Sequence, residues 1–425
     1  MLYDRWLQVA RSCRDEIALR DLSTGSKWTF AQLSAAADKP PSQTHQVAFP
    51  TGISADFIIS VLQAWRTGRV VCPLEPGQAP PNMTGELPPG IIHLKTTSAT
   101  TGTSRLIAFT AEQLIADAQN IISTMGLSND WPNLASISLA HSYGFSNLVL
   151  PLLLQGIPLI LAGSSLPEAV QRAAATERAI TLAAVPTLWR LWHEANAIPS
   201  NVRLAISAGA PLPLALEHSV FGSHGLKIHN FYGSSECGGI AYDASSGARM
   251  DDSCAGAPLQ NVCCSIASDG CLEVRSSAVG QTYWPESSSN LGAGVFHTSD
   301  LAEISYGLVY LRGRATDQIN VAGRKVLPET IEKALKTHPD VRDALVFGVP
   351  TAEAGRGERI VACIEVRSGI SGESLKQFLT AKLPSWQLPR DCWLVDSLEA
   401  NERGKLSRAE WRRKYLAERI RKIIG

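Results

Sequence analysis

The sequence predicts an α/β protein: a large N-terminal domain of layered sheets with a β-rich subdomain, then a small C-terminal α+β domain. Three observations support this. Apolar strand-like runs alternate with helix-like segments over the first 250 residues, short turn-punctuated strands follow, and a second alternation begins after residue 314. The 425 residues and 45% hydrophobic content are sufficient for a large buried core, and the length suggests two or three domains.

The N-terminal elements follow one another as strand and helix. "HQVAFPT" (45–51) is strand-like, "SADFIISVLQAWRTG" (54–68) has helical spacing with a glycine stop, and "RVVCPL" is a short strand. Further strands are expected over 133–140, 180–186 and 202–211, and further helices over 168–179 and 187–197. Such alternation is typical of sheets covered by helices.

The pattern of expected elements changes after about residue 250. Short strands are expected over 271–277, 295–305 and 308–314, which indicates a β-rich subdomain. The rest forms a small unit with helices over 328–339 and 372–383 and strands over 341–350 and 359–366. We therefore predict an N-terminal domain over 1–314 and a C-terminal domain over 315–425.

Composition argues against several classes of function. The net charge is zero and the pI is about 7.1, whereas nucleic-acid binding and attachment to anionic membranes usually need a basic excess. The nine cysteines form no CxxC pair, which favours free thiols in a reducing compartment. The most apolar run, 148–163, is short and broken by Pro151 and Pro158, so we expect a buried helix–turn–strand in a cytoplasmic protein.

The stretch "TSATTGTSR" (97–105) combines hydroxyl side chains with a glycine behind the apolar segment "GIIHL". Small side chains let backbone N–H groups approach an anion, so such a loop can hold phosphate oxygens. It is not a Walker A loop, because GxxxxGK[ST] is absent. Taken alone the signal is weak, because Ser/Thr-rich loops are mostly ordinary turns.

Three later segments also contain candidate site residues. "NFYGSSECGG" (230–239) offers Tyr232 for base stacking and Glu236 for Mg²⁺, Asp300 ends a strand-like run, and Lys405 follows a glycine in "NERGKLSR". Each has a structural alternative. The first is also consistent with an aromatic anchor in a loop, the second with a turn cap, and the third with a solvated surface charge.

The order of these segments resembles the adenylate-forming superfamily, which comprises acyl- and aryl-CoA synthetases, adenylation domains of nonribosomal peptide synthetases, and luciferases. "KWTFAQL", "VLQAWRTGRVVCPLEP", "SLAHSYGFSNLVLPLLLQGIPLIL", "AISAGAPLP", "GRATDQINVAGRKVLPETIEKAL" and "NERGKLSR" follow in family order over nearly the whole chain. No single motif decides the assignment; the ordered set is specific. The chain is shorter than most members, which implies an N-terminal lobe pruned within its first 100 residues.

The resemblance implies ATP and Mg²⁺ as cofactors and assigns roles to residues. Ser235 would bond the α-phosphate, Glu236 would hold Mg²⁺, and Lys405 would bridge carboxylate and α-phosphate. The nucleotide would be bound by Thr97, Ser98, Thr100, Thr101, Gly102, Thr103, Arg105, Gly209, Ala210, Tyr232, Gly233, Asp300 and Arg314, with Tyr232 stacked on adenine and Asp300 and Arg314 on the ribose. The C-terminal domain would rotate about a hinge at Thr316 and bring Gly323 to the thiol tunnel.

The chain departs from the family pattern at four positions. Ala99 replaces a glycine of the phosphate loop, Ser104 replaces proline, and Arg105 replaces lysine, which keeps the charge with altered geometry. Thr316 stands where the hinge usually has Asp or Lys. These changes leave open a degenerate nucleotide-binding protein that no longer turns over.

The acid and the acceptor are predicted by resemblance. The acyl pocket would be lined by His141, Tyr143, Ala208, Gly209, Gly233 and Gly238. His141 has no carboxylate near it in the sequence, which favours an acid without an α-amino group over amino-acid activation; a core histidine is the structural alternative. We expect an aryl acid rather than a medium-chain acyl acid, and a thiol of CoA or of an acyl carrier protein's phosphopantetheine as acceptor.

The C-terminal segment bears on this acceptor. From Lys405 onward it has eight basic and two acidic residues, a net charge of +6, and Trp411, Tyr415, Ile420 and Ile424 fall near helical spacing. The basic face is consistent with docking of an acidic acyl carrier protein or with a solvated helix surface.

Overall fold

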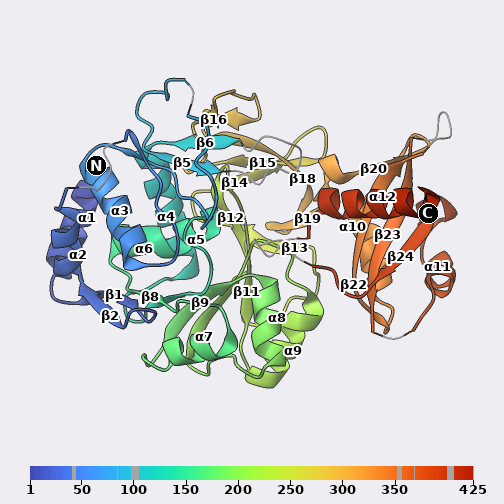
Figure 1. Cartoon of the computed structure of the whole chain (residues 1–425), viewed down its shortest axis with the longest axis horizontal. Coiled ribbons are helices and arrows are strands. Elements are labelled where there is room, and N and C mark those ends of the chain that lie inside the picture. The colour runs from blue at the N-terminus through green and yellow to red at the C-terminus, as the bar shows by residue number, and fades with distance from the viewer. Residues whose placement is uncertain are drawn as a thin grey trace.

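The predicted α/β architecture is confirmed. The computed structural model describes residues 1–40, 45–83, 85–96, 105–351, 357–367, 369–399 and 406–424, the last five as backbone alone. Figure 1 shows a large sheet-rich N-terminal region and a smaller C-terminal region beside it. Strand β19 (Leu308–Arg314) ends where the one-turn 3₁₀ helix η2 (Ala315–Asp317) begins, and the C-terminal elements follow.

The largest sheet changes from parallel to antiparallel along its width. Its order is β14-β15-β18-β19-β13-β12-β11-β10-β9-β7-β8-β1-β2, and β17 pairs with β18. The pairs from β11 through β8 to β1 are parallel and the remaining pairs are antiparallel. The strands are β1 (Ile17–Asp21), β2 (Ser26–Thr29), β7 (Asn133–Ala135), β8 (Leu159–Leu161), β9 (Ile180–Ala184), β10 (Val202–Ser207), β11 (Ile228–Ser234), β12 (Gly238–Tyr242), β13 (Cys254–Pro258), β14 (Cys263–Ile266), β15 (Cys271–Arg275), β17 (Leu291–Gly292) and β18 (Val295–Ser305).

The burial of the strands differs between the parallel and the antiparallel part of this sheet. The parallel strand β9 is buried at every position, as expected for a strand covered on both faces, whereas β18 is half-exposed along most of its length. The covering helices are α1 (Leu2–Ser12), α2 (Phe30–Ala37), α3 (Ala55–Arg66), α4 (Ala111–Met125), α5 (Ser142–Gly144), α6 (Leu150–Gln155), α7 (Pro167–Ala174), α8 (Pro186–Glu194) and α9 (Leu214–His224), with a π-helical turn η1 (Phe145–Val149) between α5 and α6. Figure 1 shows α7, α8 and α9 gathered on one side of the N-terminal region and α1 to α3 at its far end.

A second sheet contains the two strands that flank the predicted phosphate loop in the sequence. Its order is β16-β6-β5-β4-β3, with β3 (Val47–Ala48), β4 (Val70–Val71), β5 (His93–Thr96), β6 (Leu106–Phe109) and β16 (Thr282–Trp284). Strands β5 and β6 are antiparallel, and Thr96 lies opposite Leu106. The segment 97–105 therefore connects two paired strands.

The C-terminal region contains a three-stranded sheet of order β22-β23-β24 with helices on both faces, and a separate two-stranded sheet of β20 and β21. It contains β20 (Ile319–Val321), β21 (Arg324–Val326), α10 (Pro328–Lys336), β22 (Val341–Pro350), β23 (Glu358–Val366), α11 (Gly372–Thr380), the 3₁₀ turn η3 (Ser385–Gln387), β24 (Asp391–Val395) and α12 (Arg408–Ile424). Helices α10 and α11 pack one core against the sheet. Trp411 and Tyr415 of α12 pack a second core with Leu345 and Phe347 on the other face, so the predicted apolar spacing of α12 is used inside this region.

The expected elements differ from the structure mainly at their ends. The strand expected over 133–140 is β7, Asn133–Ala135. Residues 136–140 are not paired as a strand, the Ser138 hydroxyl donates to Glu75, and the chain then turns into α5. The apolar run 148–163 is a buried helix, a left-handed Gly156 and strand β8, as predicted. No described helix is both long and apolar enough to cross a membrane.

Candidate active site

The described residues on either side of the predicted phosphate loop contact other site elements. Thr97, Ser98, Thr100, Thr101, Gly102 and Thr103 lie outside the described residues, as do Ala99 and Ser104. The residues that flank the loop are described. Lys95 precedes it and is buried beneath α5, while the Arg105 guanidinium that follows it lies 5.6 Å from the ring centroid of Tyr283.

The predicted nucleotide residues Tyr232, Asp300 and Arg314 are brought together from β11, β18 and β19. The Tyr232 hydroxyl donates to Asp300 Oδ2 at 2.5 Å, and Arg314 Nε donates to Asp300 Oδ1 at 2.9 Å. Burial raises the pKa of Tyr232 well above its ordinary value, and the Asp300 charge raises it further. Tyr232 therefore remains a protonated donor, and both oxygens of Asp300 are oriented by bonds from neighbours.

Glu236 lies in the turn between β11 and β12, where the large sheet becomes antiparallel. Its backbone carbonyl accepts the Gly280 N–H at 2.8 Å, and its Oε1 accepts the Tyr283 hydroxyl at 3.1 Å. Ser235 precedes it and is partly exposed. The carboxylate is therefore held in place and offers the oxygen ligands that Mg²⁺ prefers. Tyr283 also contacts Arg105, so the turn and the exit of the phosphate loop share one aromatic residue.

The predicted acyl-pocket residues lie on α5 and the ends of β10, β11 and β12. The Tyr143 hydroxyl donates to the Ile206 carbonyl at 3.3 Å, and its ring lies 5.9 Å from that of Phe231. Ala208 and Gly238 are buried, whereas Gly209, Ala210 and Gly233 retain exposure. Gly209 and Gly238 have φ of +86° and +69°, a conformation that glycine adopts without strain.

A carboxylate that the sequence did not reveal lies beside His141. Glu75, 66 positions earlier in the chain, places Oε1 3.2 Å from His141 Nε2 and accepts the Ser138 hydroxyl at 2.5 Å. Local sequence suggested a histidine without such a neighbour. The pair comes from the loop after β4 and the segment after β7, and only the folded chain shows the contact.

A buried ion pair is the second feature that sequence reasoning missed. Lys95 Nζ lies 3.8 Å from Asp117 Oδ2 of α4, and both side chains are almost fully buried. Asp117 Oδ1 accepts the Gly239 N–H at 3.1 Å, and Oδ2 accepts the Ser146 hydroxyl at 2.6 Å. The pair thus joins β5, α4, η1 and β12 directly beside the turn that carries Glu236.

The C-terminal residues of the predicted site are partly described. Lys405 lies outside the described residues, and Gly323 is exposed in the turn between β20 and β21. Thr316 is exposed in η2. Arg408, three residues after Lys405, pairs with Asp317 at 2.7 Å, Glu329 at 2.8 Å and Glu332 at 2.9 Å. The helix that follows Lys405 is therefore bound to the end of η2.

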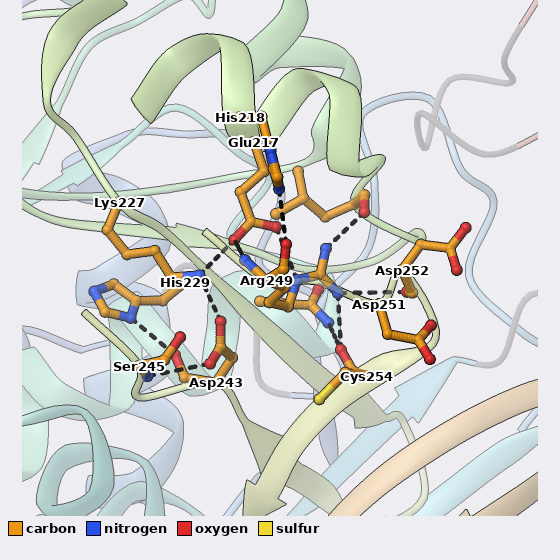
Figure 2. Close-up of polar contacts among 12 residues, drawn as sticks. Glu217, His218, Lys227, His229, Asp243, Ser245, Arg249, Asp251, Asp252 and Cys254 are labelled. Atoms are coloured by element: carbon orange, nitrogen blue, oxygen red, sulfur yellow. Dashed lines mark hydrogen bonds and ion pairs between the residues drawn. The ribbon is translucent and has the colours of Figure 1, made fainter. Parts of the chain in front are cut away.

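A buried ionic cluster supports the segment that carries Ala208, Gly209 and Ala210. Figure 2 shows Glu217 of α9 between Lys227 and Arg249, with Asp243 on the other side of Lys227. Arg249 Nη2 donates to the Leu212 carbonyl at 2.7 Å, and its Nη1 donates to the Cys254 carbonyl at 2.8 Å. The cluster therefore joins the end of this predicted pocket segment to β13.

Comparison with known proteins decides the family. The profile described as AMP-binding enzyme matches residues 91–284, and the profile described as AMP-binding enzyme C-terminal domain matches 330–405. The chain belongs to the AMP-binding enzyme family. The predicted membership of the adenylate-forming superfamily is confirmed.

Curated relatives and solved structures agree with this family. A probable 2-succinylbenzoate–CoA ligase of Mycobacterium tuberculosis is 29% identical over 339 residues, 76% of this chain and 84% of that protein. A feruloyl-CoA synthase of Amycolatopsis sp. is 28% identical over 75% of this chain and 69% of its own length. The o-succinylbenzoate CoA synthetase MenE of Bacillus subtilis, solved with its acyl-adenylate OSB-AMP, has a TM-score of 0.82 at 20% identity, covering 96% of this chain and 97% of MenE. This likeness confirms the fold, and the expected ligase class matches the names of the relatives.

Proposed function

We propose that this AMP-binding enzyme is a ligase that uses ATP to convert an aromatic carboxylic acid to an acyl-adenylate and then transfers the acyl group to the thiol of CoA. One observation carries the proposal. Tyr232, Asp300 and Arg314 form a hydrogen-bonded group, and Glu236 lies on the turn between β11 and β12 that meets the β5–β6 hairpin. A nucleotide bound there would have its adenosine near the first group and its phosphates near the hairpin.

In the proposed first step, an oxygen of the substrate carboxylate attacks the α-phosphorus of ATP, and the bond to the bridging oxygen of pyrophosphate breaks. No general base is needed, because the nucleophile is already an anion. Negative charge grows on the phosphate oxygens, so preorganised donors and cations near them lower the barrier. We assign Ser235, Arg105 and Lys405 to this role, and Mg²⁺ held by Glu236 would neutralise charge on the leaving pyrophosphate.

In the proposed second step, the thiol sulfur attacks the acyl carbonyl carbon, AMP leaves with the electron pair of the broken bond, and the thiol proton is lost to solvent. We propose that the C-terminal domain then rotates about Thr316 so that the turn holding Gly323 lines the thiol path. The exposure of Gly323 and Thr316 is consistent with both roles.

An aromatic acid is proposed because the pocket residues combine Tyr143, packed on Phe231, with small residues at Ala208, Gly209 and Gly233. A flat ring fits between small residues and an aromatic wall. Two of the relatives above are named for aromatic acids. His141 directly precedes α5, two residues before Tyr143, and its pair with Glu75 is proposed to orient the acid.

CoA is proposed as the acceptor because the relatives are named CoA enzymes. The basic face predicted for α12 supports a carrier protein less well than its sequence suggested. Besides Arg408, three described cations on α12 are in ion pairs: Arg412 with Glu358, Lys414 with Glu399 and Glu410, and Arg419 with Asp391. The acidic residues of the same region thus balance much of the positive charge.

The test is ATP–pyrophosphate exchange with benzoates, cinnamates, fatty acids and amino acids, followed by acylation of CoA and of an acyl carrier protein. Exchange with aromatic acids and acylation of CoA are expected. Exchange confined to amino acids would replace the proposal with amino-acid activation. Lys405→Ala should lose exchange and keep ATP binding; a wild-type protein that binds ATP but exchanges with no acid would be a degenerate nucleotide-binding protein.

A further inference from the structure

The surroundings of Lys95 suggest a role that the proposed chemistry does not assign. Its side chain leaves β5 for the interior, retains 4% exposure, and lies 4.6 Å from the ring centroid of Phe109. Lysine is seldom buried to this extent without a partner. Burial lowers the pKa of Lys95, and the nearby charge of Asp117 opposes that shift.

The ammonium lies directly against the predicted acyl pocket. Its Nζ donates to the hydroxyl of Ser142 at 3.1 Å, and Ser142 stands between the pocket residues His141 and Tyr143. The partner Asp117 touches the pocket from the other side. A Cβ atom built on Gly238 would clash with Asp117 Oδ1, so the carboxylate packs on the backbone of another pocket residue.

The hydrogen bonds of Lys95 are incomplete. An ammonium has three N–H donors. Among the described residues, Ser142 accepts one at 3.1 Å and Ser146 one at 3.5 Å, while Asp117 is 3.8 Å away, beyond hydrogen-bond distance. Asp117 already accepts from Ser146 and Gly239. Within the described part of the chain the third donor therefore has no acceptor within hydrogen-bond distance, and a molecule bound beside Ser142 would supply one.

We propose that Lys95, with Ser142, determines substrate specificity by binding a hydroxyl group on the ring of an aromatic acid. This inference rests on the proposed function. The hydroxyl oxygen would accept from the Lys95 ammonium, and its proton would be donated to Ser142. A ring without the hydroxyl would leave one donor of the buried ammonium without an acceptor. An unpaired buried donor is costly, so such an acid would be used less well.

Charge favours a hydroxyl over a second carboxylate. The Lys95 cation is already balanced by Asp117, and the Glu236 carboxylate adds further negative charge nearby. An additional anion in this buried place would be unbalanced, and unbalanced buried charge is costly. A neutral acceptor adds a hydrogen bond without changing the balance.

The experiment compares matched acids in ATP–pyrophosphate exchange: benzoate, its three monohydroxy isomers, and benzene-1,2-dicarboxylate. We expect one hydroxybenzoate to exceed benzoate by at least about 10-fold in kcat/KM, since a hydrogen bond to a charged group is the stronger kind. Equal use of benzoate, or preference for the dicarboxylate, would overturn the role of Lys95 and leave the proposed function intact. No exchange with any aromatic acid would instead overturn both.

Variants separate specificity from folding. Lys95→Met leaves Asp117 unpaired, so the double variant K95M/D117N is the main test: it removes both charges, and the amide oxygen that replaces the carboxylate can still accept from the Gly239 N–H. We expect it to use hydroxybenzoate and benzoate within about 3-fold of each other, with KM for ATP changed less than the acid preference. The control is Lys382→Met, which removes an exposed lysine over Phe378 in the C-terminal region. Unchanged acid preference in K95M/D117N, or equal loss with all acids, would overturn the proposal.

Discussion

At the residue scale, the proposed Mg²⁺ ligand gives the most direct test of the site. Glu236→Gln keeps the shape of the side chain and removes its charge. We expect exchange to fall by about 10²-fold or more, because charge stabilisation of the leaving phosphates would be lost. Tyr283→Phe removes only the 3.1 Å hydrogen bond to Glu236 Oε1 and should cost less than about 10-fold. Equal exchange in Glu236→Gln and wild type would remove Glu236 from the mechanism.

His93, on the same face of β5 as Lys95, predicts a pH dependence of stability. Its ring is fully buried, both ring nitrogens are without a hydrogen-bond partner among the described residues, and it lies 4.5 Å from the ring of Phe145. Burial, and secondly the charge of Lys95, hold its pKa well below the ordinary 6.5. The unfolded chain therefore binds a proton below pH 6.5 that the folded chain excludes.

The free energy of unfolding should accordingly decrease as pH falls below about 6.5, by up to about 1.4 kcal/mol per pH unit from this group alone. The stability is fully present above that pH. His93→Phe replaces the ring with an apolar one and should make the dependence shallower between about pH 6.5 and 5. Urea denaturation of both proteins across this range and above it measures the difference, and parallel pH profiles would contradict the prediction.

These residues also show what sequence reading can and cannot provide. Tyr232, Asp300 and Arg314 were found because they occupy motifs in a fixed order, and the fold brings them into one hydrogen-bonded group. Lys95 and Asp117 belong to no motif. The one available signal is "IIHLKTT", where a lysine shares the face of a strand with a histidine in an apolar segment. The partner of a buried charge comes from a distant element, so only the folded chain reveals it.

At the scale of elements, the cluster in Figure 2 makes a stability prediction. Glu217, Lys227, Asp243 and Arg249 are all buried and join α9, the residue before β11, the residue after β12 and the loop before β13. Arg249→Met leaves Glu217 short of a partner and should cost about 3–5 kcal/mol. The double variant E217Q/R249M should recover part of that loss.

Arg312→Met is the matched control for this cluster, because Arg312 pairs with Glu303 on the surface and should cost no more than about 1 kcal/mol. Urea denaturation ranks the three variants. A double variant less stable than Arg249→Met would contradict this expectation. It would show that the stability of the buried Lys227 and Asp243 side chains depends on the charge of Glu217.

Element types were predicted better than element functions. The buried helix–turn–strand of 148–163 follows from its apolar residues and Gly156. The basic face of α12 was predicted from charge alone, but Arg408, Arg412, Lys414 and Arg419 all pair with acidic residues of other elements. A helix's charge count therefore overstates its surface charge when its neighbours are acidic.

At the scale of the whole molecule, two ion pairs define which residues can act as a pivot. Arg314 is bound to Asp300 of the N-terminal region, and Asp317 is bound to Arg408 of α12. Ala315 and Thr316 lie between these two anchors. If the C-terminal domain rotates between half-reactions, as proposed, the backbone change falls on these two residues.

Thr316→Pro tests this directly. Proline fixes φ near −65° and restricts the residue before it, so the pivot would have few alternative conformations. We expect pyrophosphate exchange to stay within about 3-fold of wild type while CoA acylation from preformed adenylate falls by at least about 10-fold, because only the second step requires the new orientation. Thr316→Ala keeps the backbone free and should leave both rates unchanged. If Thr316→Pro carried out both half-reactions at wild-type rates, the pivot would lie at other residues. Loss of exchange alone would mean that the structure's orientation, with Lys333 paired to Asp252 across the two regions, is the one that serves thioester formation.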